Sequence, residues 1–102
     1  VKKMENMQFG TLGPANADIQ NLIDQVQGQV ENQTLGQLNI YNAVSVRKQT
    51  LAGGTNWLVK VNVGNDFIHL MINQMEGAQV NQPPALTGLQ QGHLADDPLA
   101  PF

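Results

Sequence analysis

The chain has 102 residues, a net charge of −3 and no cysteine. This length predicts one domain over residues 1–102, and a hydrophobic content of 41% argues against intrinsic disorder. With only five basic residues the chain lacks the positive charge of a phosphate-binding surface, so we expect no nucleic-acid partner.

The cysteine-free composition excludes disulfides and thiolate chemistry and suits a reducing compartment. No apolar run approaches the ~18 residues that cross a membrane, so we expect no membrane partner. The first residues, Val1 to Met7, lack the apolar core of a signal peptide. These features favour a cytoplasmic protein and leave secretion open.

Residues 1–15 predict an N-terminal arm, because Gly10, Gly13 and Pro14 disfavour a helix. We expect this arm to be irregular and flexible. Asn16 then has the character of a helix N-cap, and one long helix is predicted from there to about residue 33. Apolar residues recur at helical spacing along one stripe of it: Ile19, Leu22, Ile23, Val26 and Val30.

Four strands are predicted after the helix, over residues 38–50, 54–64, 67–75 and 85–93. Apolar residues of the first three strands share a parity within each strand: Ile40, Val44 and Val46; Trp57, Val59, Val61 and Val63; Ile68, Leu70 and Ile72. Each strand thus has one apolar face, as the helix has one apolar stripe. The pattern predicts an α+β fold in which the helix packs on a twisted antiparallel sheet of four to five strands.

The turn between the first two strands, Gln49 to Gly54, carries no charge. Hairpin turns commonly carry Asn-Gly or charged residues, whereas Leu51, Ala52 and two glycines lose bound water at little cost. Such a turn can enter a narrow cleft and leave its backbone groups free to hydrogen-bond a partner. It can also do no more than close a hairpin, with Leu51 folded back on the sheet.

Catalytic groups are scarce in this sequence. The two histidines, His69 and His93, are far apart along the chain, and we expect His69 to be a surface residue on a polar strand face. Asp96 and Asp97 are adjacent and predict a solvated turn rather than an acid–base pair. We therefore expect no enzymatic activity, no metal site and no cofactor.

The segment Gln49 to Gly53 resembles the Gln-x-Val-x-Gly signature of the cystatins, with Leu51 where valine is usual and Gly54 as an additional residue of the turn. The resemblance covers most of the chain, and the Asp96–Leu99 segment with the final Phe102 is similar to the tail of stefins, the cysteine-free intracellular branch. The other segments that resemble the family, in chain order, are Ile19–Val26 in the helix, Ala43–Ser45, Thr55–Trp57 with Lys60–Val61, Phe67–Leu70 and Leu86–Gly88 in the strands.

This resemblance implies the cystatin fold and reversible, competitive inhibition of papain-like cysteine proteases of the cathepsin type. Three segments would then contact the protease: an arm, the hairpin turn, and the loop that starts at the end of the 67–75 strand. The residues implied are Phe9 and Gly10; Gln49, Thr50, Leu51, Ala52 and Gly53; and Met75 and Glu76, with Val80 as a further apolar residue.

Several alternatives stay open from sequence. Gly10 and Gly13 compete as the key glycine of the arm, and we favour Gly10 because Phe9 precedes it. The same fold also suits an interaction protein, or an engineered loop scaffold, that does not inhibit proteases. We expect a monomer, with a domain-swapped dimer as the other possibility.

Overall fold

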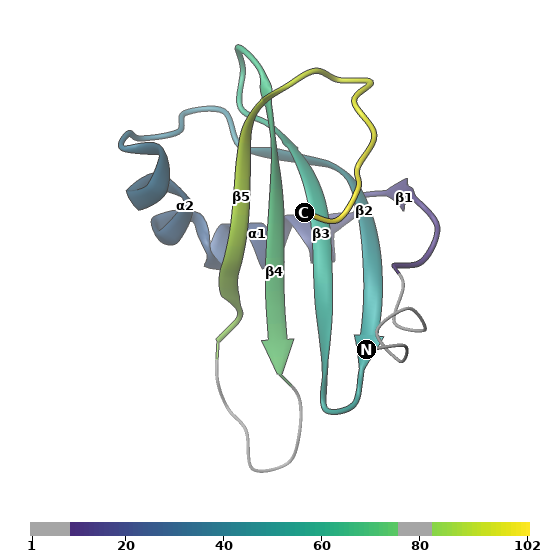
Figure 1. Ribbon diagram of the computed structural model, residues 1–102. Helices are drawn as coiled ribbons and strands as arrows, with labels where there is room; N and C mark the ends of the chain where they lie inside the picture. Colours follow the sequence, from purple (N-terminus) through teal and green to yellow (C-terminus); the bar gives the residue numbers. More distant parts are fainter. Residues whose placement is uncertain (1–8, 76–82) are drawn as a thin grey trace.

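The computed structural model describes residues 9–75 and 83–102 of the chain. Within them the elements are β1 (Gly13–Pro14), α1 (Ala17–Gln25), α2 (Gln27–Thr34), β2 (Asn42–Leu51), β3 (Gly54–Asn62), β4 (Phe67–Met75) and β5 (Ala85–His93). The strands form one antiparallel sheet in the order β1-β2-β3-β4-β5, with the helices across one face and the C-terminal tail across the other (Figure 1). The predicted α+β class is confirmed.

The helical region is two segments rather than the single long helix that the sequence predicts. Asn16 caps α1 as expected, since its Oδ1 accepts a hydrogen bond of 3.0 Å from the Ile19 amide. The chain leaves helical geometry at Val26, whose amide donates to the carbonyl of Ile23, only three residues back. Val26 is β-branched and Gly28 lies two residues further along, and both residue types lower helix propensity.

The face of the sheet that carries the helices holds the main core, as the periodicities predict. Residues of the helical stripe meet the matched apolar residues of β3 and β4 there, and Tyr41 donates its hydroxyl to the Ile23 carbonyl at 2.7 Å. Burial raises the pKa of Tyr41 far above its usual value. The core consists of Ile19, Leu22, Ile23, Val26, Val30, Tyr41, Val59, Val61, Ile68, Leu70 and Ile72.

The first long strand departs from its predicted pattern. β2 begins at Asn42 rather than residue 38, and its pairing with β3 shifts between Ala43 and Ser45. The residue in the shift, Val44, is 42% exposed, while Val46 packs on the core. A bulge inserts one residue and moves the following side chains to the opposite face, which the alternation in sequence does not reveal. The predicted common face of Ile40, Val44 and Val46 is therefore wrong.

The opposite face of the sheet is partly buried beneath the tail, and this corrects the expectation for His69. Its side chain is 1% exposed, and its ring stacks on that of His93 with centroids 3.7 Å apart. Among the described residues the buried Nε2 of His69 has no hydrogen-bond partner. Burial, with the His93 ring and the Lys60 ammonium nearby, lowers the pKa of His69 to about 4. Strand alternation predicts correctly that His69 lies on this face, but it does not predict that the C-terminal tail covers the face.

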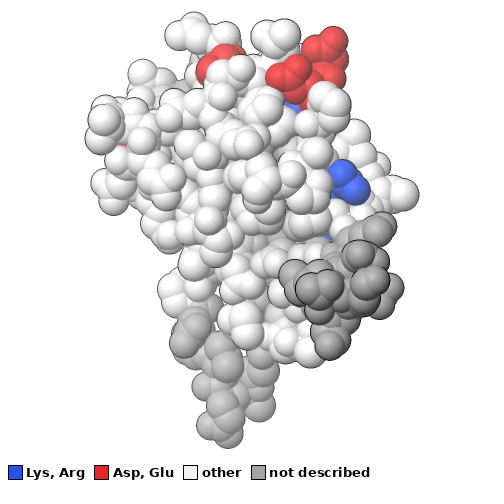
Figure 2. Space-filling model, viewed as in Figure 1, with Lys and Arg blue, Asp and Glu red and all other residues white. Residues whose placement is uncertain are grey.

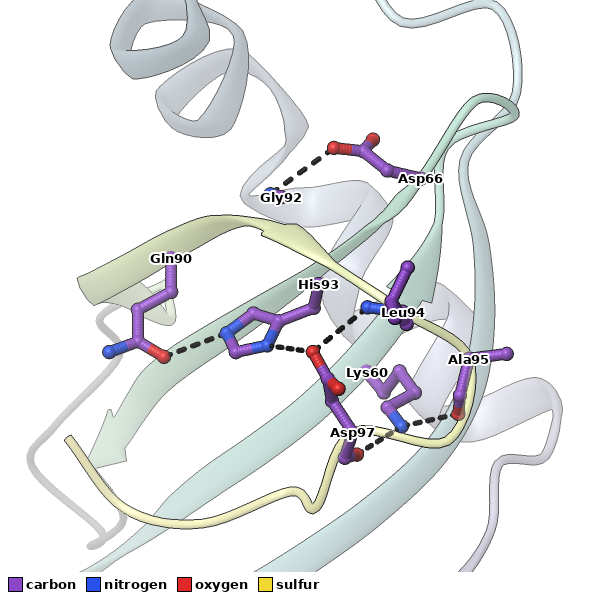
Figure 3. Close-up of polar contacts among 8 residues, drawn as sticks. All are labelled: Lys60, Asp66, Gln90, Gly92, His93, Leu94, Ala95 and Asp97. Atoms are coloured by element: carbon purple, nitrogen blue, oxygen red, sulfur yellow. Dashed lines mark hydrogen bonds and ion pairs between the residues drawn. The ribbon is translucent and has the colours of Figure 1, made fainter.

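The tail is attached to the sheet by side chains of β3 and β5 (Figure 3). The Lys60 ammonium donates to the carbonyls of Ala95 and Asp97 at 2.6 and 2.5 Å. The Asp97 carboxylate accepts from the Leu94 amide and contacts Nδ1 of His93, each at 2.9 Å, and these bonds lower its pKa. The predicted turn at Asp96–Asp97 is thus where side chains of the sheet hold the tail in place. Further along, the Phe102 ring lies against Gly88, where a Cβ would approach it to 2.9 Å.

Candidate functional site

The uncharged turn is shorter than its sequence suggests. β2 ends at Leu51, β3 begins at Gly54 and the two residues pair, so only Ala52 and Gly53 lie in the loop. Both are exposed, and Gly53 has a φ of +84°, which favours glycine. Gly54 is therefore not an additional loop residue. A Cβ there would lie 2.8 Å from the Gln74 carbonyl oxygen, so the close approach of β4 requires a glycine.

Side-chain amides brace the strands just behind the turn. Nδ2 of Asn56 donates to Oε1 of Gln49 at 2.9 Å, and Nδ2 of Asn73 donates to Oδ1 of Asn56 at 2.8 Å. This row links β2, β3 and β4 across the sheet. Gln49, an expected contact residue, is thus held by its own sheet, and the neighbouring Thr50 is exposed.

Met75 lies beside the turn. It ends β4 opposite Gly54 and is 42% exposed. Its Cε lies 3.9 Å, and its Sδ 3.1 Å, from the positions that a Cβ would take on Gly53 and Gly54. The half-buried Leu51 pairs with the same Gly54 from the other side, so apolar residues flank this glycine on β2 and on β4. The other expected residues of this loop, Glu76 and Val80, lie outside the described residues.

The described part of the arm runs along β2 toward the turn. Gly13 pairs with Val46 in the short strand β1, and the Gly10 amide donates to the Lys48 carbonyl at 2.7 Å. Gly10 is therefore about 7 Å nearer the turn than Gly13, at two strand residues. Sequence did not predict β1, since a two-residue strand that ends in proline has no periodicity.

Arg47 contacts the arm in a way that sequence reasoning missed. Its guanidinium donates to the carbonyls of Gly10 and Phe9 at 2.9 and 3.3 Å, and to that of Leu99 at 2.8 Å. A lone arginine in a strand looks like an ordinary surface residue. Because the groups that accept its hydrogen bonds are backbone carbonyls, no pattern of side chains in the sequence predicts these contacts.

Charge is unevenly distributed over the face of the molecule that Figure 2 draws. On the face shown in Figure 2, the visible acidic side chains gather at the end away from the β2–β3 turn, and the described surface around the turn is uncharged. The basic residue closest in sequence to the turn, Lys48, has its Nζ 5.6 Å from the centroid of the Trp57 ring. The two loop residues, Ala52 and Gly53, carry no charge themselves.

A hollow of about 270 Å³ lies on the helical side, between α1 and the strands β3 and β4. Its wall includes Trp57, whose Nε1 donates to Oε1 of Gln74 at 3.2 Å. The residues around it are Asp18, Ile19, Leu22, Gln25, Trp57 and Gln74.

Within residues 9–75 and 83–102, no three side chains of His, Cys, Asp or Glu are arranged to hold a metal ion. In the same part of the chain, no helix has the length and apolar character needed to cross a membrane.

Comparison with known proteins gives relatives that cover nearly the whole chain, although no family model matches it. Cystatin-B of Homo sapiens is 37% identical over 90 residues, which is 87% of this chain and 90% of that protein. Cystatin-A8 of Sus scrofa is 36% identical over 90 residues, 87% and 85% of the two chains. Stefin-C of Bos taurus is 35% identical over 95 residues, 92% of each.

Proposed function

The chain belongs to the stefin-type cystatins, and we propose that it is a reversible, competitive inhibitor of papain-like cysteine proteases of the cathepsin type. One observation carries the proposal: Ala52–Gly53 is an exposed, uncharged turn with Met75 packed beside it and Gly10 bonded to the same strand. Arm, turn and strand end thus share one edge of the sheet. We propose that these segments together act as a wedge.

The wedge would block the protease without reacting with it. The turn enters the cleft beside the catalytic cysteine–histidine pair, where small residues permit close backbone approach. Phe9 supplies an apolar side chain for the non-primed side, and Gly10 lets the backbone turn away before it reaches the thiol. Met75 and Glu76 contact the primed side. Because no peptide carbonyl is presented for attack, no acyl-enzyme forms and binding stays reversible.

The two parts of the wedge would contribute differently to affinity. The turn is already ordered by strand pairing and the row of amides, so its docking costs little conformational entropy. A protease–inhibitor interface of standard size buries about 1,600 Å² in total. The arm before Gly10 gains contacts on binding and would chiefly slow dissociation.

We place this activity in the cytoplasm, on the likeness to stefins and on the cysteine-free sequence. The protein would act as a monomer, because one wedge fills one cleft.

Titration of papain tests the proposal. With a fluorogenic peptide substrate, the protein should abolish activity at a one-to-one ratio, and the apparent inhibition constant should rise linearly with substrate concentration. After prolonged incubation the inhibitor should be recovered at its full mass, since no bond is cleaved or formed. Unchanged turnover at micromolar protein would instead indicate an interaction protein or a loop scaffold.

A further inference from the structure

Arg47 joins two ends of the chain that have no other described hydrogen bond to each other. Through Nε and Nη2 it holds the carbonyls of Gly10 and Phe9, and through Nη1 it holds the carbonyl of Leu99. These contacts span 37, 38 and 52 residues of sequence. The planar guanidinium carries five donors in a fixed fork, so it can serve several acceptors at once, which a lysine cannot match.

The two ends differ in how firmly they are held elsewhere. Leu99 is buried at 4% exposure, and the preceding turn is fastened by Lys60. In the arm, the segment from Gly10 to Leu12 is exposed. The described backbone hydrogen bond of this segment is the one that the Gly10 amide donates to the Lys48 carbonyl. Arg47 therefore couples a weakly held segment to a firmly held one.

From this geometry we infer that Arg47 is a positioning residue for protease inhibition: it fixes Phe9 and Gly10 along β2 before a protease arrives, with the C-terminal tail as its second anchor. The inference rests on the proposed function. Arg47 need not touch the protease, because it acts through the arm. The chain beyond Gly10 then starts from a fixed point beside the turn, and fewer arm conformations have to be lost on binding.

Removal of the guanidinium should release the arm and leave the turn intact. We expect Arg47→Ala to speed dissociation from papain about tenfold, the factor that corresponds to loss of about one charge-assisted hydrogen bond. The association rate should stay within about twofold, since the turn still enters the cleft. The dissociation rate of Arg47→Lys should lie between those of the parent protein and of Arg47→Ala. Lys48→Ala is the matched control, since it removes the same charge from the adjacent residue.

A double-mutant cycle distinguishes positioning from a general structural role. Arg47→Ala, deletion of residues 1–10, and the two changes together are compared by their dissociation rates. Positioning predicts a tenfold effect of Arg47→Ala in the full chain and little effect once the arm is gone. The same factor in both backgrounds would overturn the inference, because Arg47 would then act on the rest of the wedge.

Amide exchange in the free protein supplies a readout without protease. The Gly10 amide should exchange faster in Arg47→Ala and Arg47→Lys than in the parent protein, whereas the core amides of β3 should be unchanged. Equal Gly10 protection in all three would overturn the inference even if inhibition holds. A parent protein that fails to inhibit papain but shows the exchange difference would sink the proposed function and leave the ordering of the arm standing.

Discussion

The hairpin turn and the arm lie at the same edge of the sheet but are ordered by different means. The turn closes two strands paired without a shift from Ser45–Lys60 to Leu51–Gly54, and the amides of Gln49, Asn56 and Asn73 brace it. The described part of the arm is held by the two-residue strand β1, two further backbone bonds (Gly10 to Lys48 and Ala15 to Val44) and Arg47. In the proposed mechanism, the rigid turn enters the protease cleft and the tethered arm slows dissociation of the complex.

This difference assigns separate kinetic roles to the two elements. Changes in the turn should prevent a productive complex from forming, because strand pairing and the bracing amides already fix the conformation that would enter the cleft. Changes in the arm should leave the association rate nearly unchanged and raise the dissociation rate. The following variants test that separation, in order of decreasing effect on inhibition.

The largest effect is expected from Gly53→Lys. The turn requires a positive φ at this position. In the proposed complex Gly53 lies inside the cleft, so a long charged side chain would block entry and would have to be desolvated. We expect the inhibition constant for papain to rise on the order of 100-fold or more, measured by titration with competing substrate.

Gly92→Lys is the matched control for this change. Gly92 also has a positive φ, +74°, and lies near the end of β5 with nothing within 4 Å of a Cβ. The same residue type and the same strain are thus introduced away from the wedge. Equal weakening by both variants would contradict a role for the turn itself.

Deletion of residues 1–10 should have the second largest effect. The arm is lost while the strands and the turn keep their pairing, so the association rate should stay within about threefold and dissociation should accelerate roughly 10- to 100-fold. Stopped-flow association and displacement by excess competitor measure the two rates. A deletion that slows association and leaves dissociation unchanged would reverse the roles assigned here.

Met75→Ala should weaken inhibition about three- to tenfold, because a protease that covers this half-exposed side chain removes apolar area from water. The inhibition constant for papain is again the measurement. Leu94→Ala serves as the comparison, since Leu94 is 64% exposed and follows β5 at its far end from Met75. Met75 would have no place in the wedge if the two variants behaved alike.

His69→Phe should leave inhibition at pH 7 unchanged and alter the pH dependence of stability. The pKa of His69 is about 4 in the folded chain, against about 6.5 when unfolded. The folded state thus binds fewer protons, so stability is complete above pH 6.5 and decreases as pH falls toward 4. The loss across this window amounts to about 3 kcal/mol.

Phenylalanine keeps a ring against His93 but takes up no proton, so urea unfolding of the variant should lack this loss between pH 7 and pH 4. Asp97 makes both proteins less stable in acid. Because its pKa is lowered in the folded state, its contribution to stability is complete above the ordinary carboxyl pKa and is lost as the pH falls through the lowered pKa. An equally steep decrease in the variant would mean that His69 does not govern acid sensitivity.

The two faces of the sheet show how far sequence leads. On the helical face, the alternation of Val59 and Val61 in β3 and of Ile68, Leu70 and Ile72 in β4 identified the buried residues correctly. On the other face the same alternation assigned His69 to the surface. The cover there is the tail from Leu94 to Phe102, an irregular segment without a period, so its position had to come from the structure.

The candidate site divides in the same way. Residue type alone was enough to single out the turn, because uncharged small residues in a hairpin are conspicuous. Its true length depended on strand register, which assigned Gly54 to β3. Arg47 was beyond prediction, since its acceptors are carbonyls of distant residues, and the bulge at Val44 that sets the strand faces leaves no trace in composition.

Amide exchange of the turn with and without saturating papain tests the central claim most directly. If the turn enters the cleft, the amides of the exposed residues Ala52 and Gly53 should exchange far more slowly in the complex. The amides of Gly64–Asp66, in the connection between β3 and β4 at the other end of the sheet, should be unchanged. Fully inhibited papain with Ala52 and Gly53 still exchanging at the rate of the free protein would contradict the account.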